Sequence, residues 1–156
     1  MTKTTPATGH VAFQIPDEVV STSPEETDRL AASVASTLKP GDVVCLYGDL
    51  GAGKTRFVKG VAAFFGIDQN MVSSPTFTLI NEYPADIPVY HFDCYRINDV
   101  REAIDIGTED YLYGNGICLI EWAEKIEAII PDDALHITIA KLSKSERLFR
   151  FNPRSE

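Results

Sequence analysis

The feature that most constrains this chain is a glycine-rich segment between an apolar run and an amphipathic one. Gly48-Asp49-Leu50-Gly51-Ala52-Gly53-Lys54-Thr55 fits the pattern G-x-x-x-x-G-K-[ST] in full. The apolar run Asp42–Tyr47 before it is typical of a buried parallel strand, and the residues from about Gly53 to Phe65 predict a helix. Strand, loop and helix in this order are the context that a phosphate-binding loop requires.

Each residue type in this loop suits a bound triphosphate and its metal ion. The glycines let backbone N–H groups approach phosphates without a Cβ in the way, and the following helix directs its positive end at the same anion. Lys54 supplies a cation to the β and γ phosphates, and the Thr55 hydroxyl is a magnesium ligand. We therefore expect ATP with Mg²⁺ to be bound by Gly48, Asp49, Leu50, Gly51, Ala52, Gly53, Lys54 and Thr55.

A second apolar run ends in an acid. Ile117–Ile120 reads as a buried strand, and Glu121 follows it directly. A carboxylate at the end of a neighbouring strand is what a P-loop nucleotidase needs to hold magnesium or its water, so we predict this role for Glu121. The alternative is an acid that caps a helix beginning near Trp122. Trp122 itself is open between core packing and a functional ring.

Two further segments carry candidate chemistry. If His91–Arg96 is a strand, His91, Asp93 and Tyr95 share one face, which favours a magnesium-linked or switch role for Asp93. For His91, a structural and a functional role are equally open. The hydroxyl-rich stretch Val72–Thr78 lies where nucleotidases place a γ-phosphate sensor, although Ser73 or Ser74 also suits a turn.

The order of elements predicts an α/β fold with a mixed sheet, parallel core strands, an antiparallel hairpin and helices on both faces. The length of 156 residues suits one P-loop domain over 1–156, with residues 1–10 as a flexible N-terminus. The expected strands are 11–15, 42–47, 76–83, 89–95, 117–120, 135–140 and 148–151. The expected helices begin near Ser23, Gly53, Asp99 and Trp122, with an interruption at Gly107.

Charge and cysteine content limit the environment and the partners. The net charge of -9 argues against autonomous nucleic-acid binding, and 13 acids fall between Glu82 and Asp133. The bases crowd the end of the chain, where they form a solvated strand face or a docking or nucleotide-contact edge: Lys141, Lys144, Arg147, Arg150 and Arg154. Cys45, Cys94 and Cys118 lie in apolar stretches and are expected to be reduced and buried. With no apolar stretch long enough for a signal or a membrane span, we expect a cytoplasmic protein.

Four segments together resemble the TsaE (YjeE) family of small bacterial P-loop ATPases. They are Gly48–Thr55, Ser74-Pro75-Thr76-Phe77-Thr78-Leu79, His91-Phe92-Asp93-Cys94-Tyr95-Arg96 and Leu119-Ile120-Glu121-Trp122-Ala123-Glu124. Their order and spacing agree with the family from about Pro24 to Ile139.

The resemblance implies the ATPase component of tRNA threonylcarbamoyladenosine synthesis, acting with the TsaD and TsaB proteins, and contact with tRNA only through that complex. It implies that Lys54 and Thr55 bind phosphate and magnesium, that Glu121 is a metal-site acid, and that Asp93 and Trp122 support hydrolysis. The stretch Ser74–Thr76 would be a switch loop. Arg56 departs from the family, in which a second threonine is frequent at this position.

Two other functions remain open from the sequence. A small-molecule kinase would need an acceptor pocket and an arginine-bearing lid, and no arginine-rich lid is visible after the loop helix. A nucleotide-gated binding module without useful turnover would use the same loop. Partner-dependent ATP consumption would separate these functions from the ATPase.

Overall fold

The computed structural model describes residues 13–74 and 79–151. The predicted flexible N-terminus 1–10 lies outside the described residues, as do Arg154, Thr76 and the rest of the segment 75–78. Among the described residues, no helix combines the length and the apolar character needed to span a membrane.

Within these residues, one sheet of seven strands forms the centre of the molecule, in the order β1-β7-β6-β2-β5-β4-β3. β2 lies parallel to β5 and β6, and β4 lies parallel to β5. The pairs β3–β4, β6–β7 and β1–β7 are antiparallel. The strands are β1 (Glu18–Ser21), β2 (Val43–Tyr47), β3 (Ile80–Tyr83), β4 (Val89–Asp93), β5 (Ile117–Glu121), β6 (Leu135–Lys141) and β7 (Arg147–Phe151). The predicted mixed sheet with parallel core strands and an antiparallel hairpin is confirmed.

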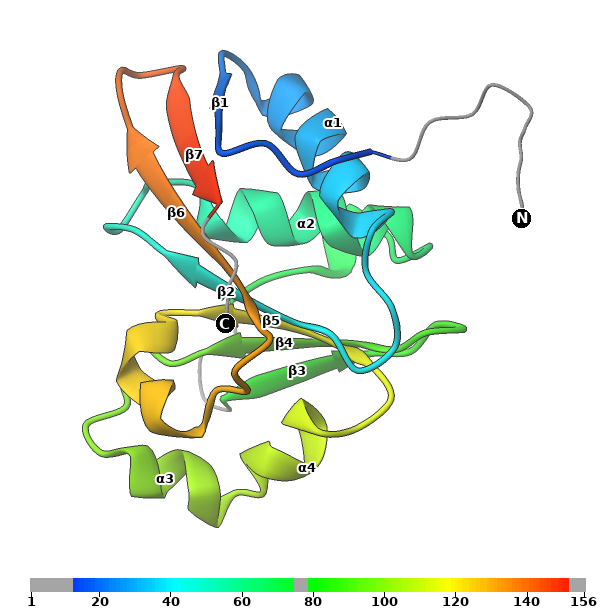
Figure 1. Ribbon diagram of the computed structural model, residues 1–156, viewed down its shortest axis with the longest axis vertical. Coiled ribbons are helices and arrows are strands. Elements are labelled where there is room, and N and C mark those ends of the chain that lie inside the picture. The colour runs from blue at the N-terminus through cyan, green and yellow to red at the C-terminus, as the bar shows by residue number, and fades with distance from the viewer. Residues whose placement is uncertain (1–12, 75–78, 152–156) are drawn as a thin grey trace.

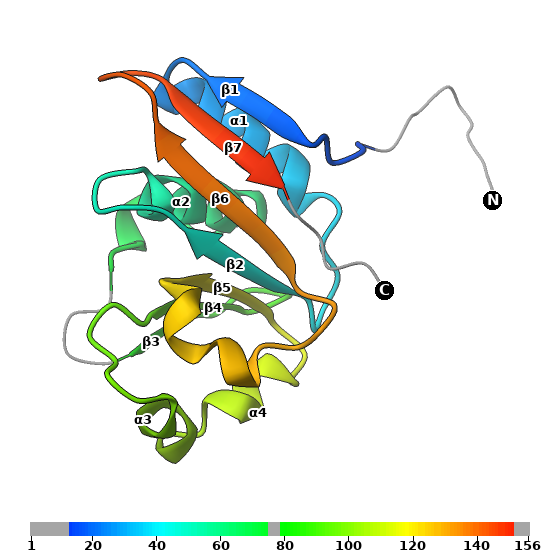
Figure 2. The same cartoon turned by 60° about the vertical axis from the view of Figure 1, so that its left-hand side comes forward.

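Helices cover both faces of the sheet, as predicted (Figures 1 and 2). One face carries α1 (Pro24–Ala35) and α2 (Lys54–Phe64), which the short 3₁₀ helix η2 (Gln69–Met71) follows. The other face carries α3 (Val100–Asp105), α4 (Thr108–Leu112) and the 3₁₀ helix η3 (Ala123–Ile129). Because strand side chains alternate, Val44 and Leu46 pack on the α1–α2 face while Val43 and Cys45 pack on the other. Apolar runs without alternation in the sequence therefore became strands buried on both faces.

The start of α1 follows its sequence signal. The Ser23 hydroxyl accepts a hydrogen bond from the Glu26 N–H at 3.1 Å, and Pro24 occupies the first helical position. The Glu26 carboxylate reaches back one residue further than a capping box requires and accepts from the Thr22 N–H at 2.6 Å. The Glu26 carboxylate also accepts from the Thr22 hydroxyl at 2.8 Å. The start of α1 is therefore stabilised by the Ser23 cap and by the contacts between Glu26 and Thr22.

Close packing of α1 on α2 depends on a glycine. A Cβ at Gly60 would lie 2.5 Å from the Cβ of Ala31 and 3.3 Å from the Cα of Asp28. The two helices approach one another closely because Gly60 has no side chain and Ala31 has only a methyl group. Arg56, one turn earlier on α2, donates to Asp28 at 2.8 Å and ties the helices at the same contact.

Three elements differ from the sequence prediction. Residues 13–15 are not a strand, and the first strand is Glu18–Ser21, an edge strand with mostly exposed residues that pairs with β7. The predicted helix from Trp122 to Ile130 is a 3₁₀ helix with non-helical angles at Ile126. Tyr95 lies beyond the end of β4 at Asp93. The predicted break at Gly107 is confirmed, since this residue (φ 85°) separates α3 from α4.

Candidate functional site

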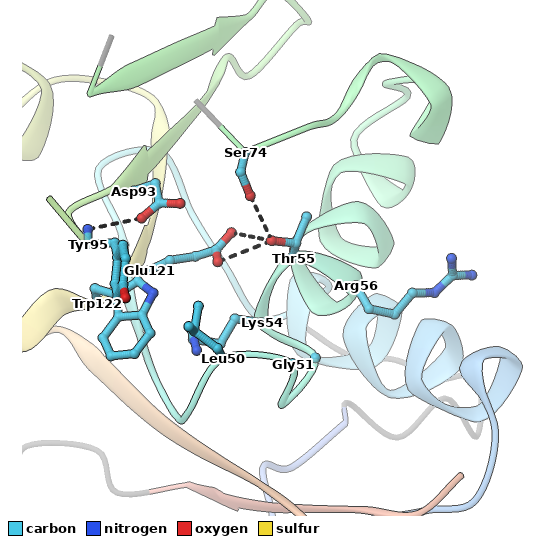
Figure 3. A pocket seen from close by; sticks show the side chains of 11 residues that line it. Leu50, Gly51, Lys54, Thr55, Arg56, Ser74, Asp93, Tyr95, Glu121 and Trp122 are labelled. Carbon is cyan, nitrogen blue, oxygen red and sulfur yellow. Dashed lines mark hydrogen bonds between the residues drawn. The ribbon is translucent and has the colours of Figure 1, made fainter. Parts of the chain in front are cut away.

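The glycine-rich loop connects the end of β2 to the start of α2 and borders an open cavity of about 290 Å³ (Figure 3). Gly53 precedes α2 with φ 111°, a left-handed conformation that residues with a Cβ adopt only under strain. Gly53 and the first two residues of α2, Lys54 and Thr55, line the cavity, so the unpaired N–H groups of the helix start lie beside it. The cavity is lined by Leu50, Gly51, Gly53, Lys54, Thr55, Arg56, Ser74, Asp93, Tyr95, Glu121 and Trp122.

Lys54 is buried, and its ammonium contacts three groups. It donates to the backbone carbonyls of Gly48 and of Asp49, the second at 2.9 Å, and lies 4.3 Å from the centre of the Trp122 ring. Burial lowers the pKa of Lys54, and the nearby Glu121 opposes this shift. These partners are neutral, so an anionic phosphate would compete with them strongly for the ammonium group.

Thr55 and Glu121 meet in the inner corner of the cavity. The Thr55 hydroxyl donates to the Glu121 carboxylate at 2.8 Å and 3.1 Å, and the Ser74 hydroxyl lies 3.1 Å from it (Figure 3). Leu46 is the register partner of Glu121 on β2, so the parallel pairing places this acid beside the loop. No side-chain cap bond is made at the start of η3, and the capping role considered for Glu121 is absent from this geometry.

Strand alternation brings further residues to the same face of the sheet. His91 is fully buried and lies 2.7 Å from the Glu121 carboxylate through Nε2. Asp93 lies at the cavity wall, where its Oδ1 accepts from the Tyr95 N–H at 3.0 Å. Burial raises the pKa of the Asp93 carboxyl; the Tyr95 hydrogen bond opposes the shift and the charge of Glu121 adds to it.

Trp122 stands at the cavity mouth in an unusual backbone conformation. It is the non-glycine residue of the described part with positive φ, at 59°. Its ring centre lies 4.9 Å from that of Tyr95, and its other neighbour is the Lys54 ammonium. Trp122 is partly buried, so the ring both packs and lines the cavity.

The donor atoms of this corner suit magnesium. Thr55, Ser74, Asp93 and Glu121 all present oxygen, which is the ligand atom that Mg²⁺ prefers. Among the described residues, no group of three or more His, Cys, Asp or Glu could hold a metal ion by itself. That composition fits magnesium held by a hydroxyl, one or two carboxylates and substrate phosphates.

Two further hollows flank the loop, and sequence motifs did not predict either of them. One shares Gly53 and Arg56 with the main cavity and has a volume of about 100 Å³; its other lining residues are Ser23, Pro24, Thr27, Lys144, Ser145, Arg147 and Phe149. The second lies on the outer side of the loop against the end of β6 and includes Lys141. The basic residues near the end of the chain therefore have different surroundings. Lys144 and Arg147 line the first hollow, Lys141 lines the second, and Arg150 pairs with Glu18 at 2.8 Å.

Comparison with known proteins agrees with this geometry. Residues 21–149 match the family described as threonylcarbamoyl adenosine biosynthesis protein TsaE. The chain belongs to the TsaE family. Members of this family are P-loop nucleotide-binding proteins of tRNA modification, which confirms the resemblance seen in the four sequence segments.

Individual TsaE relatives match most of the chain. A Bacillus subtilis protein named tRNA threonylcarbamoyladenosine biosynthesis protein TsaE is 48% identical over 130 residues, which cover 83% of this chain and 80% of that protein. A protein of the same name from Treponema pallidum is 41% identical over 128 residues, covering 82% and 94%. The crystal structure of YdiB from Bacillus subtilis superposes with a TM-score of 0.73 at 39% identity, covering 88% of this chain and 85% of that one.

Proposed function

We propose that the chain is a magnesium-dependent ATPase required for threonylcarbamoyladenosine modification of tRNA. The observation that carries this proposal is the convergence of Lys54, Thr55 and Glu121 on one cavity at the carboxyl ends of parallel strands. Open α/β sheets bind ligands at this edge. The names of the relatives support the process, and the chemistry of the cavity supports the nucleotide.

Each proposed residue has a definable task in hydrolysis. The amides of Gly48–Thr55 and the Lys54 ammonium bind the phosphates and stabilise charge that develops on the γ-phosphoryl group. Thr55 and Glu121 would hold magnesium, which supplies charge neutralisation on the β and γ phosphates. Asp93 faces the same space with a raised pKa, a property suited to orienting a water or accepting its proton. Trp122 would place the Lys54 ammonium and close the mouth beside it.

The hollow that shares Gly53 and Arg56 with the main cavity is our candidate for the nucleoside end of ATP. This hollow adjoins the main cavity at Gly53 and Arg56, beside the start of α2 where the phosphates would bind. The hollow near Lys141 lies on the outer side of the loop, behind Gly48 and Asp49. Among the basic residues considered as a nucleotide-contact edge, we therefore propose Arg147, and not Lys141, as the contact of the nucleoside end.

The proposed cycle couples ATP to partner proteins in the cytoplasm. ATP binding and hydrolysis would drive or reset a complex of the TsaB and TsaD proteins, and tRNA would be contacted through that complex. The net charge of -9 supports indirect contact with tRNA, because an acidic chain gains little from direct contact with a phosphate backbone.

The test is ATP hydrolysis measured with and without TsaB and TsaD proteins, in the presence and absence of magnesium. We expect slow turnover alone, faster turnover with both partners, and loss of tight ATP binding in Lys54→Ala by calorimetry. Unchanged nucleotide affinity in this variant would contradict the assigned loop. Phosphate transferred to a small acceptor instead of water would show a kinase.

A further inference from the structure

The inner side of Glu121 contacts a histidine whose role the sequence left open. His91 is 0% exposed, and its Nε2 lies 2.7 Å from Oε2 of Glu121. An ionised carboxylate only accepts hydrogen bonds, so Nε2 carries the proton in this contact. The other ring nitrogen, Nδ1, is buried and has no hydrogen-bond partner among the described residues. The contact of His91 with a polar group is thus directed at the proposed metal-site acid.

On its other side, His91 is linked through Tyr83 to Ser73, which lies in the segment after α2 and η2. The Tyr83 ring stacks on His91 with centres 6.4 Å apart, and its hydroxyl lies 3.4 Å from both the N–H and the carbonyl oxygen of Ser73. Asn81, the register partner of His91, donates to the Ser73 carbonyl at 3.0 Å and to the Tyr83 hydroxyl at 3.3 Å. Tyr83 is 6% exposed whereas Ser73 is exposed, so this connection runs from the core to the surface beside the cavity.

The contacts of Glu121, His91, Tyr83 and the Ser73–Ser74 segment form a closed ring that includes Thr55. Ser74 follows Ser73 and lies 3.1 Å from the Thr55 hydroxyl, which in turn donates to Glu121. A path of packed side chains therefore runs from Glu121 through His91 and Tyr83 to Ser73, and returns through Ser74 and Thr55. Two of these contacts lie behind the cavity: His91 contacts Glu121 and Tyr83 contacts Ser73, and neither His91 nor Tyr83 lines the cavity.

We propose that His91 and Tyr83 are positioning residues for magnesium: His91 fixes the Glu121 carboxylate, and Tyr83 holds the Ser73–Ser74 segment in register with it. The inference rests on the proposed function, in which Glu121 serves the metal. Partners that orient a metal ligand commonly change metal affinity by about 10- to 100-fold when removed. A histidine that merely filled space in the core would change stability and leave the metal untouched.

The experiment measures ATP affinity by calorimetry with magnesium and with a chelator, and takes the ratio of the two as the magnesium effect. His91→Leu should reduce the magnesium effect by about tenfold or more and leave affinity in the chelator unchanged. His91→Gln should retain most of the effect, because the side-chain amide of glutamine can still donate to Glu121. His91→Asn, whose shorter amide does not reach, should behave like His91→Leu and serves if the leucine variant fails to fold.

Tyr83→Phe removes a single hydroxyl and tests the second half of the proposal. We expect its magnesium effect to fall by about two- to tenfold, the value of one or two neutral hydrogen bonds. Tyr90→Phe is the matched control on the neighbouring strand, since the Tyr90 ring packs on the opposite face against Tyr111. Equal effects in the two phenylalanine variants would overturn the link through Tyr83.

Glu121→Gln separates failure of this inference from failure of the proposed function. A full magnesium effect in Glu121→Gln would refute the metal role itself. A lost effect in Glu121→Gln together with a full effect in His91→Leu and His91→Asn would overturn the inference alone. Thermal unfolding of every variant provides the structural reference, because a space-filling role predicts lower stability in both amide variants with no change in the ratio.

Discussion

Lys54 and Trp122 show how single residues define this site. The ammonium is shared between two loop carbonyls and the indole ring, and a cation–π contact of this kind contributes about 0.5–2 kcal/mol. The positive φ of Trp122 costs about 1–2 kcal/mol in a residue with a Cβ. The two magnitudes are similar, so the ring contact offsets the backbone strain that places the ring over the loop. The conformation of Trp122 therefore has little net effect on the stability of the protein.

Trp122 should report nucleotide binding directly, because it is the one tryptophan of the sequence. When Lys54 turns to a phosphate, the positive charge beside the ring changes place, and we expect the emission of the indole to change saturably with ATP. Lys54→Met should show altered emission before ATP is added and no further change afterwards. Titration by intrinsic fluorescence measures both. An identical ATP response in wild type and Lys54→Met would contradict the contact.

Among single residues, those of a local motif could be predicted and those of a network could not. Lys54 and Thr55 follow from eight consecutive residues, and the strand ending in Glu121 follows from a local apolar run. Tyr83 and Asn81 belong to no motif, because their link to Ser73 depends on how the β3–β4 pairing directs two side chains. Alternation along β4 predicted that His91 and Asp93 share one face of the sheet. The contact of His91 with Glu121 could not be predicted, because Glu121 lies on another strand, β5.

At the scale of elements, α1 and α2 form the support on which the loop rests. Gly60 lets the helices meet, and Arg56 with Asp28 fixes them near the loop. The hairpin, the break at Gly107 and the strand before Glu121 could be predicted because their signals are short and local. The edge strand β1 could not, because its sequence Glu-Val-Val-Ser does not alternate apolar with polar residues and its partner β7 lies near the other end of the chain. The 3₁₀ form of η3 likewise depends on packing and not on composition.

Gly60→Ala should destabilise the protein despite the better helix propensity of alanine. Propensity favours alanine by about 1 kcal/mol, whereas forcing a methyl group into a filled contact costs about 1–3 kcal/mol. With Ala31 only 2.5 Å from the new Cβ, packing should outweigh propensity and lower the free energy of unfolding by up to about 2 kcal/mol in urea denaturation.

A double-mutant cycle supplies the control for this contact. Ala31→Gly should cost less in the Gly60→Ala background than in wild type, because it restores the missing space. Additive effects of the two substitutions would show that the helices separate freely and that this packing is not limiting.

At the scale of the whole molecule, one sheet buried on both faces brings together residues from distant parts of the sequence. Thr55, Asp93 and Glu121 reach the cavity from three separate segments, and the sheet order makes them neighbours. The same burial encloses the three cysteines, as predicted from their apolar surroundings. Burial raises the pKa of both Cys94 and Cys118 to about 12.

The thiols should therefore report global opening. An ordinary thiol has a pKa of about 8.5 and alkylates much faster at about pH 9 than at about pH 7. In the native protein the raised pKa keeps the protonated form dominant over this range, so we expect slow alkylation that hardly changes with pH. Mass spectrometry after iodoacetamide should show rapid labelling of all three thiols only in denaturant. Fast native labelling with a steep rise toward pH 9 would contradict the closed core.

The parallel register of β2 and β5 has one further consequence. Leu46 faces Glu121 across this pair, and a slip of a single residue would turn the acid to the opposite side of the sheet, away from Thr55. A misaligned chain would thus lose this acid from the metal corner even though its glycine-rich loop was intact. Strand alignment and completion of the proposed metal corner depend on the same pairing, so the magnesium effect on ATP affinity would distinguish properly paired molecules from misaligned ones.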